Sequence, residues 1–222
     1  MRLEVLGTNA AFAAQGVTNS FILWQNNNSG ILLDCGFSVY QELRQKGYAD
    51  KIDTVLISHL HQDHCGSMVN LLDYRYKILG LKTALGGTDC RRFLELHSGN
   101  GWQEKVMPLP DDIRVDCFTV PHAKGMDCYA LFINHTLLYS GDSAISILES
   151  AAATEAKMII HDVSLKGGGI IVGIDELSTA KPEIKAKTFV SHYLPKDYET
   201  LCQIAHKSGL GGVLRQGMTF EI

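Results

Sequence analysis

Short apolar runs bounded by turn-forming residues recur along the chain, and each is typical of a β-strand. They cover residues 2–7, 20–24, 30–34, 53–58, 114–120, 129–134, 136–140, 157–162 and 187–192. Stretches with helical spacing follow several of them, at residues 39–47, 67–79, 88–99, 144–153, 174–180 and 196–209. The first strands read as a meander and the later strands precede helices. The pattern therefore predicts an α/β or α+β architecture of mixed sheets with layered helices.

The boundaries between these runs carry few signs of a domain break. Turn residues at 26–30 ("NNNSG") and 133–136 ("INHT") predict hairpins. We find no internal repeat, low-complexity segment or Pro/Ser-rich linker in the sequence. A chain of 222 residues is an ordinary length for one such unit. We therefore expect a single domain spanning residues 1–222.

Polar residues stand where the apolar strands end. The runs lead directly into a histidine or an aspartate at His59, His122, Asp142, His161, Asp162 and His192. Side chains at the ends of neighbouring strands converge at one edge of a sheet and are held there by a rigid scaffold. This placement predicts a functional site at that edge.

The densest group lies in "SHLHQDHCGS", where His59, His61, Asp63 and His64 occupy six positions. His59 and His61 cannot share a helix face, but they can converge on one ion from a strand-to-helix loop. Asp63 and His64 would point toward a second ion. With His122, Asp142 and His192 the candidate ligands number seven, which exceeds the three or four that one tetrahedral ion needs. The count favours a binuclear centre, a geometry suited to hydrolysis.

The motif "HLHQDH" resembles the HxHxDH signature of the metallo-β-lactamase superfamily. "VPHAKG", "YSGDS" and "VSHYL" are similar to the remaining ligand motifs and occur in the same order, so the resemblance covers nearly the whole chain. It implies a four-layer αββα sandwich of two mixed sheets flanked by helices. The resemblance also assigns the ligands: His59, His61 and His122 to one metal, Asp63, His64 and His192 to the other, and Asp142 to both. Asp34 in "LLDCG" matches an acid that orients the ligating imidazoles.

Within the superfamily, "LGTNAAF", "YSGDS" and "IIHDVSL" look like the branch of tRNA 3′-end-processing endonucleases and related phosphodiesterases, including enzymes acting on cyclic nucleotides. The chain departs from the tRNA enzymes in three ways. It lacks a further histidine after residue 162 in the matching segment, it has no room for their protruding arm, and it has no basic surface. A small phosphodiester is therefore the expected substrate. The alternatives are a thioester, lactone or lactam, a tRNA-type endonuclease activity, and a non-enzymatic binding module.

Catalytic roles are expected for three residues. Asp63 would orient the attacking water, and His161 would give a proton to the leaving group, with Asp162 setting its tautomer. A core position for His161 is equally consistent with the sequence. The Gly-rich segment at residues 166–173 reads either as a plain loop or as a substrate loop that brings Lys166 near a phosphate.

The ligand types and the overall charge limit which cofactors and partners are expected. The donor set accommodates two divalent ions, with zinc expected first and manganese or iron as alternatives. A formal net charge of −4 and the lack of a basic patch disfavour a long nucleic acid. No apolar run reaches the roughly 20 residues that span a bilayer. Without a signal peptide and with six scattered cysteines, the chain is expected to be cytoplasmic with free thiols. The resemblance also suggests a homodimer.

Overall fold

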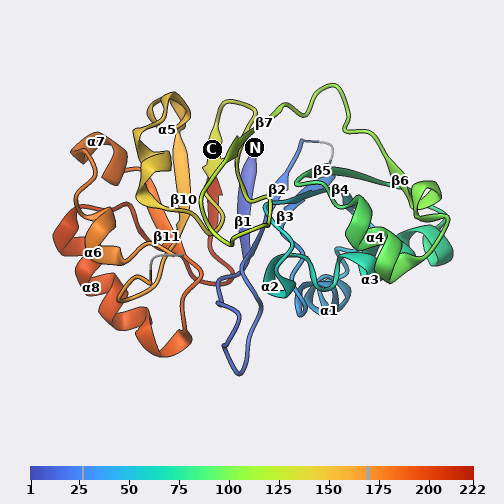
Figure 1. Cartoon of the computed structure of the whole chain (residues 1–222), viewed down its shortest axis with the longest axis horizontal. Helices are drawn as coiled ribbons and strands as arrows, with labels where there is room; N and C mark the ends of the chain where they lie inside the picture. The colour runs from blue at the N-terminus through green and yellow to red at the C-terminus, as the bar shows by residue number, and fades with distance from the viewer. Residues whose placement is uncertain (27, 169–170) are drawn as a thin grey trace.

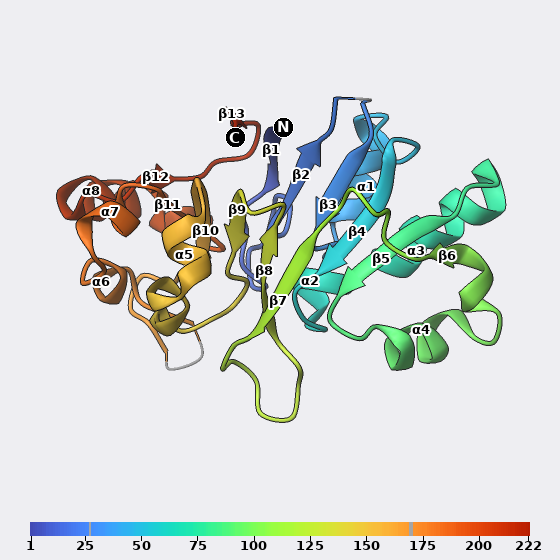
Figure 2. The ribbon, with the colours of Figure 1, turned by 90° about the horizontal axis from the view of Figure 1, so that it is seen from above.

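A computed structural model describes residues 1–26, 28–168 and 171–222. Within these residues the strands form two mixed sheets that face each other, with helices on both outer sides (Figures 1 and 2). This is the four-layer arrangement predicted from the sequence. Residue 27 of the expected turn and residues 169 and 170 of the Gly-rich segment lie outside the described residues.

The first sheet has seven strands in the order β13-β1-β2-β3-β4-β5-β6 within the described part of the chain. β1, β2, β3 and β13 pair antiparallel, whereas β3, β4, β5 and β6 pair parallel. The strands are β1 (Arg2–Gly7), β2 (Ser20–Trp24), β3 (Gly30–Leu33), β4 (Ile52–Ile57), β5 (Thr83–Gly87), β6 (Val106–Met107) and β13 (Thr219–Glu221).

The second sheet repeats this plan with six strands, again counted over the described residues, in the order β12-β11-β10-β9-β8-β7. β7, β8 and β9 pair antiparallel, and β9, β10, β11 and β12 pair parallel. The strands are β7 (Val115–Thr119), β8 (Tyr129–Ile133), β9 (Leu137–Tyr139), β10 (Met158–Asp162), β11 (Thr188–Ser191) and β12 (Gly212–Val213).

The helices divide between the two outer faces (Figure 2). Those over the first sheet are α1 (Val39–Gln45), α2 (Gln62–Cys65), α3 (Met68–Asp73) and α4 (Arg91–Ser98). Those over the second sheet are α5 (Ala151–Glu155), α6 (Ile174–Leu177), α7 (Pro182–Lys185) and α8 (Tyr198–Ser208). A π-helical turn at Tyr74–Ile78 extends α3, and 3₁₀ turns lie at Trp102–Lys105, Ile145–Glu149 and Pro195–Asp197. No helix among the described residues is long and apolar enough to cross a membrane.

Apolar side chains fill three layers, because both faces of each central strand are covered. On β2, Phe21 and Leu23 pack between the two sheets, whereas Ile22 and Trp24 pack toward the helices over the first sheet. The third layer lies between the second sheet and its own helices. Strands buried on both faces read as continuous apolar runs, which is why they could be recognised in the sequence.

A tight contact at Gly36 connects the end of β3 to α2. The backbone N–H of Cys35 donates to the carbonyl oxygen of His64 at 2.6 Å, and the N–H of Phe37 donates to that of Gln62 at 3.1 Å. A Cβ added to Gly36 would overlap the backbone carbonyl oxygen of Asp63. The two segments can therefore pack this closely only with glycine at this position.

Gly36→Ala should lower the free energy of unfolding by about 2 kcal/mol, because the added methyl group must displace backbone atoms of α2. Urea denaturation followed by circular dichroism measures the change. Gly168→Ala is the matched control, since its added Cβ would meet no heavy atom of the described residues within 4 Å. Equal stability of the two variants would contradict the prediction.

Candidate metal centre

The strand ends bring the predicted ligands to one edge of the sandwich. His59 follows β4, Asp142 follows β9, and His192 directly follows β11. His122 lies in the loop between β7 and β8. His192 has a left-handed backbone with φ of 59°, which turns the chain sharply after the strand. Segments from both sheets therefore meet here.

The short helix α2 carries the remaining candidates. His61 is its N-cap, with an extended backbone, and its carbonyl oxygen accepts hydrogen bonds from the N–H groups of His64 and Cys65 at 2.9 Å each. Asp63 and His64 lie within the helix, and both are buried. The turn into α2 thus separates His59 and His61 from Asp63 and His64.

One group of donor atoms, which we call the first cluster, consists of His59, His61, His122 and Asp142. These donor atoms lie within 4.8 Å of one another. His61 Nδ1 is 2.9 Å from His59 Nε2 and 3.1 Å from His122 Nε2. His122 Nε2 is 3.3 Å from Asp142 Oδ2. Three imidazole nitrogens and one carboxylate oxygen form a donor set suited to a tetrahedral zinc ion.

A second cluster consists of Asp63, His64 and His192, whose donor atoms also lie within 4.8 Å of one another. Asp63 Oδ2 is 3.0 Å from His192 Nε2 and 3.5 Å from His64 Nε2. Asp142 Oδ1 lies 3.7 Å from His64 Nε2 and 3.4 Å from His192 Nδ1. Asp142 therefore presents one carboxylate oxygen to each cluster.

The unpaired polar atoms of these clusters fit bound cations. Among the described residues, His64 Nε2, His192 Nδ1 and Asp142 Oδ1 are buried and make no hydrogen bond. Burial of an unpaired polar atom is costly, and a cation would satisfy all three. Burial, followed by repulsion from His64, also lowers the pKa of His59, so that its ring is neutral as a metal ligand must be.

Asp34 lies behind both clusters and is fully buried. Its Oδ2 accepts a hydrogen bond from His64 Nδ1 at 2.7 Å and from the Ser58 hydroxyl at 2.8 Å, and its Oδ1 accepts from the backbone N–H of Ser58 at 2.7 Å. Because the Ser58 hydroxyl donates to Asp34, it accepts from His59 Nδ1 at 3.0 Å. Both imidazoles therefore present Nε2 to the clusters.

His161 and Asp162 are consecutive on β10, so their side chains point to opposite faces of the sheet. His161 Nδ1 donates to the backbone carbonyl oxygen of Asp162 at 2.8 Å, and burial lowers the pKa of His161 to about 4. The Asp162 carboxylate instead contacts Asn19 and Tyr139. Asp162 therefore contacts His161 Nδ1 through its backbone carbonyl oxygen and not through its carboxylate, because the side chains of adjacent strand residues point to opposite faces. The catalytic roles of both residues stay predictions.

Sequence reasoning missed Asn19 and Tyr139. Both are fully buried, and both hydrogen-bond to the Asp162 carboxyl group. Tyr139 is the polar member of the otherwise apolar run "LLY", and a buried tyrosine usually needs a partner for its hydroxyl group. That requirement was a usable signal, although it does not identify the partner.

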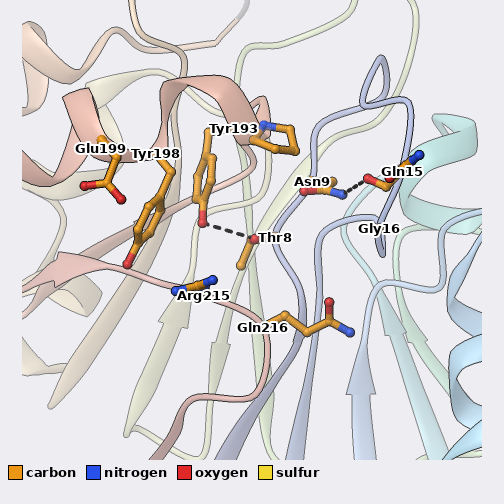
Figure 3. A pocket seen from close by; sticks show the side chains of 10 residues that line it. Thr8, Asn9, Gln15, Gly16, Tyr193, Tyr198, Glu199, Arg215 and Gln216 are labelled. Carbon is orange, nitrogen blue, oxygen red and sulfur yellow. Dashed lines mark hydrogen bonds between the residues drawn. The ribbon is translucent and has the colours of Figure 1, made fainter.

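A cavity of about 430 Å³ lies beside His192, since Tyr193 forms one of its walls (Figure 3). The Thr8 hydroxyl approaches the Tyr193 hydroxyl at 3.3 Å, and Asn9 donates to the carbonyl oxygen of Gln15 at 2.6 Å. Tyr198 and Arg215 lie next to each other on the cavity lining, with the Arg215 guanidinium carbon 5.6 Å from the centroid of the Tyr198 ring. Polar and apolar atoms line the open cavity in similar proportion, and Tyr193 connects it along the chain to His192 of the second cluster.

Comparison with known proteins places the chain in a family. The model of the family "Anti-Pycsar protein Apyc1" matches residues 1–89 and 88–220. A protein of that name from Paenibacillus sp. (strain J14) is 27% identical over 221 residues, which cover 87% of this chain and 89% of the relative.

Solved structures show the same fold. The metallo-beta-lactamase fold protein YhfI from Bacillus subtilis superposes with a TM-score of 0.77 at 20% identity, covering 99% of this chain and 98% of that chain. Zn²⁺-bound PqqB from Methylobacterium extorquens gives a TM-score of 0.71 at 14% identity, covering 100% of both chains. The predicted metallo-β-lactamase fold is thereby confirmed. Since the family model also spans nearly the whole sequence, this chain belongs to the Anti-Pycsar protein Apyc1 family.

Proposed function

We propose that this chain is a binuclear metal-dependent hydrolase that cleaves a small phosphodiester, such as a cyclic nucleotide. The observation that carries the proposal is the placement of Asp142, whose two carboxylate oxygens face different clusters of ligands. A carboxylate placed in this way can be shared between two ions. In this proposal the first and second clusters would each hold one ion, and Asp142 would contribute a ligand to both.

Zinc is the ion that the donor set favours, with manganese and iron as alternatives. Two divalent ions bound here would stabilise the negative charge that develops on the phosphoryl oxygens and would activate a water molecule. The positive charge of two divalent ions would exceed the negative charge of the carboxylates of Asp63 and Asp142. A centre with net positive charge attracts an anionic phosphodiester more strongly than a neutral thioester or lactone.

The reaction needs one proton to be removed and one to be supplied. The water oxygen forms a bond to phosphorus, one phosphorus–oxygen bond breaks, and the leaving alkoxide takes up a proton. Asp63 is 6% exposed and borders the clusters, so its carboxylate is placed to accept a hydrogen bond from the attacking water. The formal net charge of −4 and the resemblance to phosphodiesterases support a small substrate rather than a long nucleic acid.

Hydrolysis assays test the substrate class. With Zn²⁺ or Mn²⁺ present, the protein should hydrolyse bis(p-nitrophenyl) phosphate and members of a panel of cyclic nucleotides. Turnover of thioesters or lactones with silent phosphodiesters would instead support the alternative superfamily activities. Cleavage of precursor tRNA at its 3′ end would support the endonuclease alternative.

Asp63→Ala should lower kcat on the phosphodiester by at least about 100-fold, because it removes both a ligand of the second cluster and the proposed water-orienting group. Asp112→Ala, at an exposed aspartate, is the control. Steady-state kinetics together with metal analysis give the result. Full activity of Asp63→Ala would contradict the proposal.

The role of His161 as proton donor stays a prediction. Because His161 is fully buried, it could also have only a packing role. Substrates whose leaving groups differ in their need for a proton distinguish the two roles. If His161 supplies the proton, His161→Gln should slow cyclic nucleotide hydrolysis by about 100-fold. It should leave bis(p-nitrophenyl) phosphate nearly unaffected, since p-nitrophenolate leaves without protonation. Equal losses on both substrates would assign His161 to packing alone.

The two ions should leave at different pH values. Burial acts to lower the pKa of His64 and of His192, but nearby carboxylates, Asp142 foremost, raise both above the ordinary value. The pKa values of His59 and His61 are lowered, mainly by burial. Protons therefore compete better for the second cluster, and its ion should leave at a higher pH than the other on acidification.

A chromophoric zinc indicator followed during acid titration measures this release. His192→Ala should abolish the early phase and retain the late one. Simultaneous release of both ions from the wild-type protein would contradict the assigned difference.

A further inference from the structure

Tyr139 lies between the two sheets, directly behind the metal centre. Its side chain is fully buried, and its ring packs edge-on against Phe21 of the opposite sheet, with ring centroids 5.6 Å apart and planes at 65°. This contact fixes the ring, so the hydroxyl group has a defined position. The hydroxyl points at polar groups and not at the surrounding apolar layer.

Three polar side chains converge on that hydroxyl. Tyr139 donates to Asp34 Oδ2 at 2.6 Å, and Asn19 Nδ2 approaches the phenolic oxygen at 3.0 Å. Asp162 Oδ2 lies 3.3 Å from the same oxygen. Two buried carboxyl groups thus contact a phenol that carries a single proton.

The orientation of Asn19 decides where the protons lie. The Ser191 hydroxyl donates to Asn19 Oδ1 at 2.5 Å, so the amide nitrogen faces the other way. Asn19 Nδ2 then donates to Tyr139 and to Asp162 Oδ1, the latter at 2.8 Å. Both amide protons are used, and neither is available to Asp162 Oδ2.

The Tyr139 hydroxyl group has a single proton, and the shorter of its two carboxyl contacts shows where that proton lies. Asp34 Oδ2 is 2.6 Å from the phenolic oxygen, whereas Asp162 Oδ2 is 3.3 Å away. Asn19 holds the phenolic oxygen from another side. The hydrogen bond from Tyr139 to Asp34 is therefore the strong contact of this network.

The network reaches the second cluster through Asp34. The Oδ2 atom that accepts from Tyr139 also accepts from His64 Nδ1 at 2.7 Å. Loss of the Tyr139 donor would free the carboxylate of Asp34 to rotate and would release the ring of His64. This change would affect the first cluster less, because His59 is connected to Asp34 only through Ser58.

We propose that Tyr139 is a positioning residue for the second cluster: held by Phe21 and Asn19, its hydroxyl group fixes the Asp34 carboxylate and thereby directs His64 Nε2 at the ion. This inference rests on the proposed two-metal function. It predicts a selective effect on one ion, which a general loss of stability does not produce.

Competition titration with a chromophoric chelator, which resolves two zinc dissociation constants, tests the proposal. Tyr139→Phe keeps the ring against Phe21 and removes only the hydroxyl group. It should weaken the second equivalent of zinc by 10- to 100-fold, about the effect of removing a group that orients a ligand, and change the first by less than about threefold. Equal weakening of both equivalents, or wild-type affinity for both, would overturn the proposal.

Tyr193→Phe is the matched control. It removes a hydroxyl group that donates to the carbonyl oxygen of Leu214 at 2.6 Å, from a tyrosine that is also buried, without touching Asp34. Both zinc affinities should remain within about threefold of wild type. A control that weakens the second equivalent as much as Tyr139→Phe does would also overturn the proposal.

Asp34→Asn tests the same connection even if Tyr139→Phe fails to fold. It keeps the size of the side chain and removes the carboxylate that holds the His64 ring at 2.7 Å. The second equivalent of zinc should weaken by at least about tenfold and by more than the first, because His59 is connected to Asp34 only through Ser58. Equal weakening of both equivalents would contradict the inference.

The same titration separates this inference from the proposed function. A wild-type protein that binds two ions but hydrolyses no phosphodiester contradicts the proposed function and leaves the test of Tyr139 intact. Two ions bound with turnover, and no selective change in Tyr139→Phe, contradicts only the inference. A wild-type protein that takes up a single ion overturns both.

Discussion

A fully buried carboxylate at Asp34 holds together the candidate metal centre. A negative charge removed from water costs several kcal/mol unless donors surround it. Here the donors are the backbone and hydroxyl of Ser58, the ring of His64 and the hydroxyl of Tyr139. They come from the end of β4, from α2 and from β9. Satisfying one charge therefore fixes the positions of elements from both sheets.

That constraint explains how the ligands of two clusters keep their positions at a sheet edge without long loops to support them. The strands end rigidly, and each ligand lies within a few residues of a strand end or in the single turn of α2. Close packing at Gly36 holds α2 against the end of β3, so Asp63 and His64 cannot drift from the histidines before them. Asp142 then joins the clusters, because one of its carboxylate oxygens faces His122 and the other faces His192.

Long apolar strands were recognisable in the sequence, and short or glycine-rich ones were not. The nine predicted strands are all present. β5 ("TALGG") contains two glycines and too few apolar residues to stand out. β6, β12 and β13 have two or three residues and exist only through pairing with neighbours. The helices α2 and α7 have four residues each, too few to show a helical period.

The sequence by itself determined which residues could ligate a metal, because each lies next to a local signal: an apolar run that ends, or the dense motif at residues 59–64. Only the tertiary structure decided that the Asp162 side chain points away from His161 and toward Asn19 and Tyr139. Only the tertiary structure also joined Asn19 to Asp162 across 143 positions of sequence and Tyr139 to Asp34 across 105. The physical reason is that these contacts depend on strand order and on the alternation of side chains across a sheet, and both are properties of strand pairing rather than of any local segment.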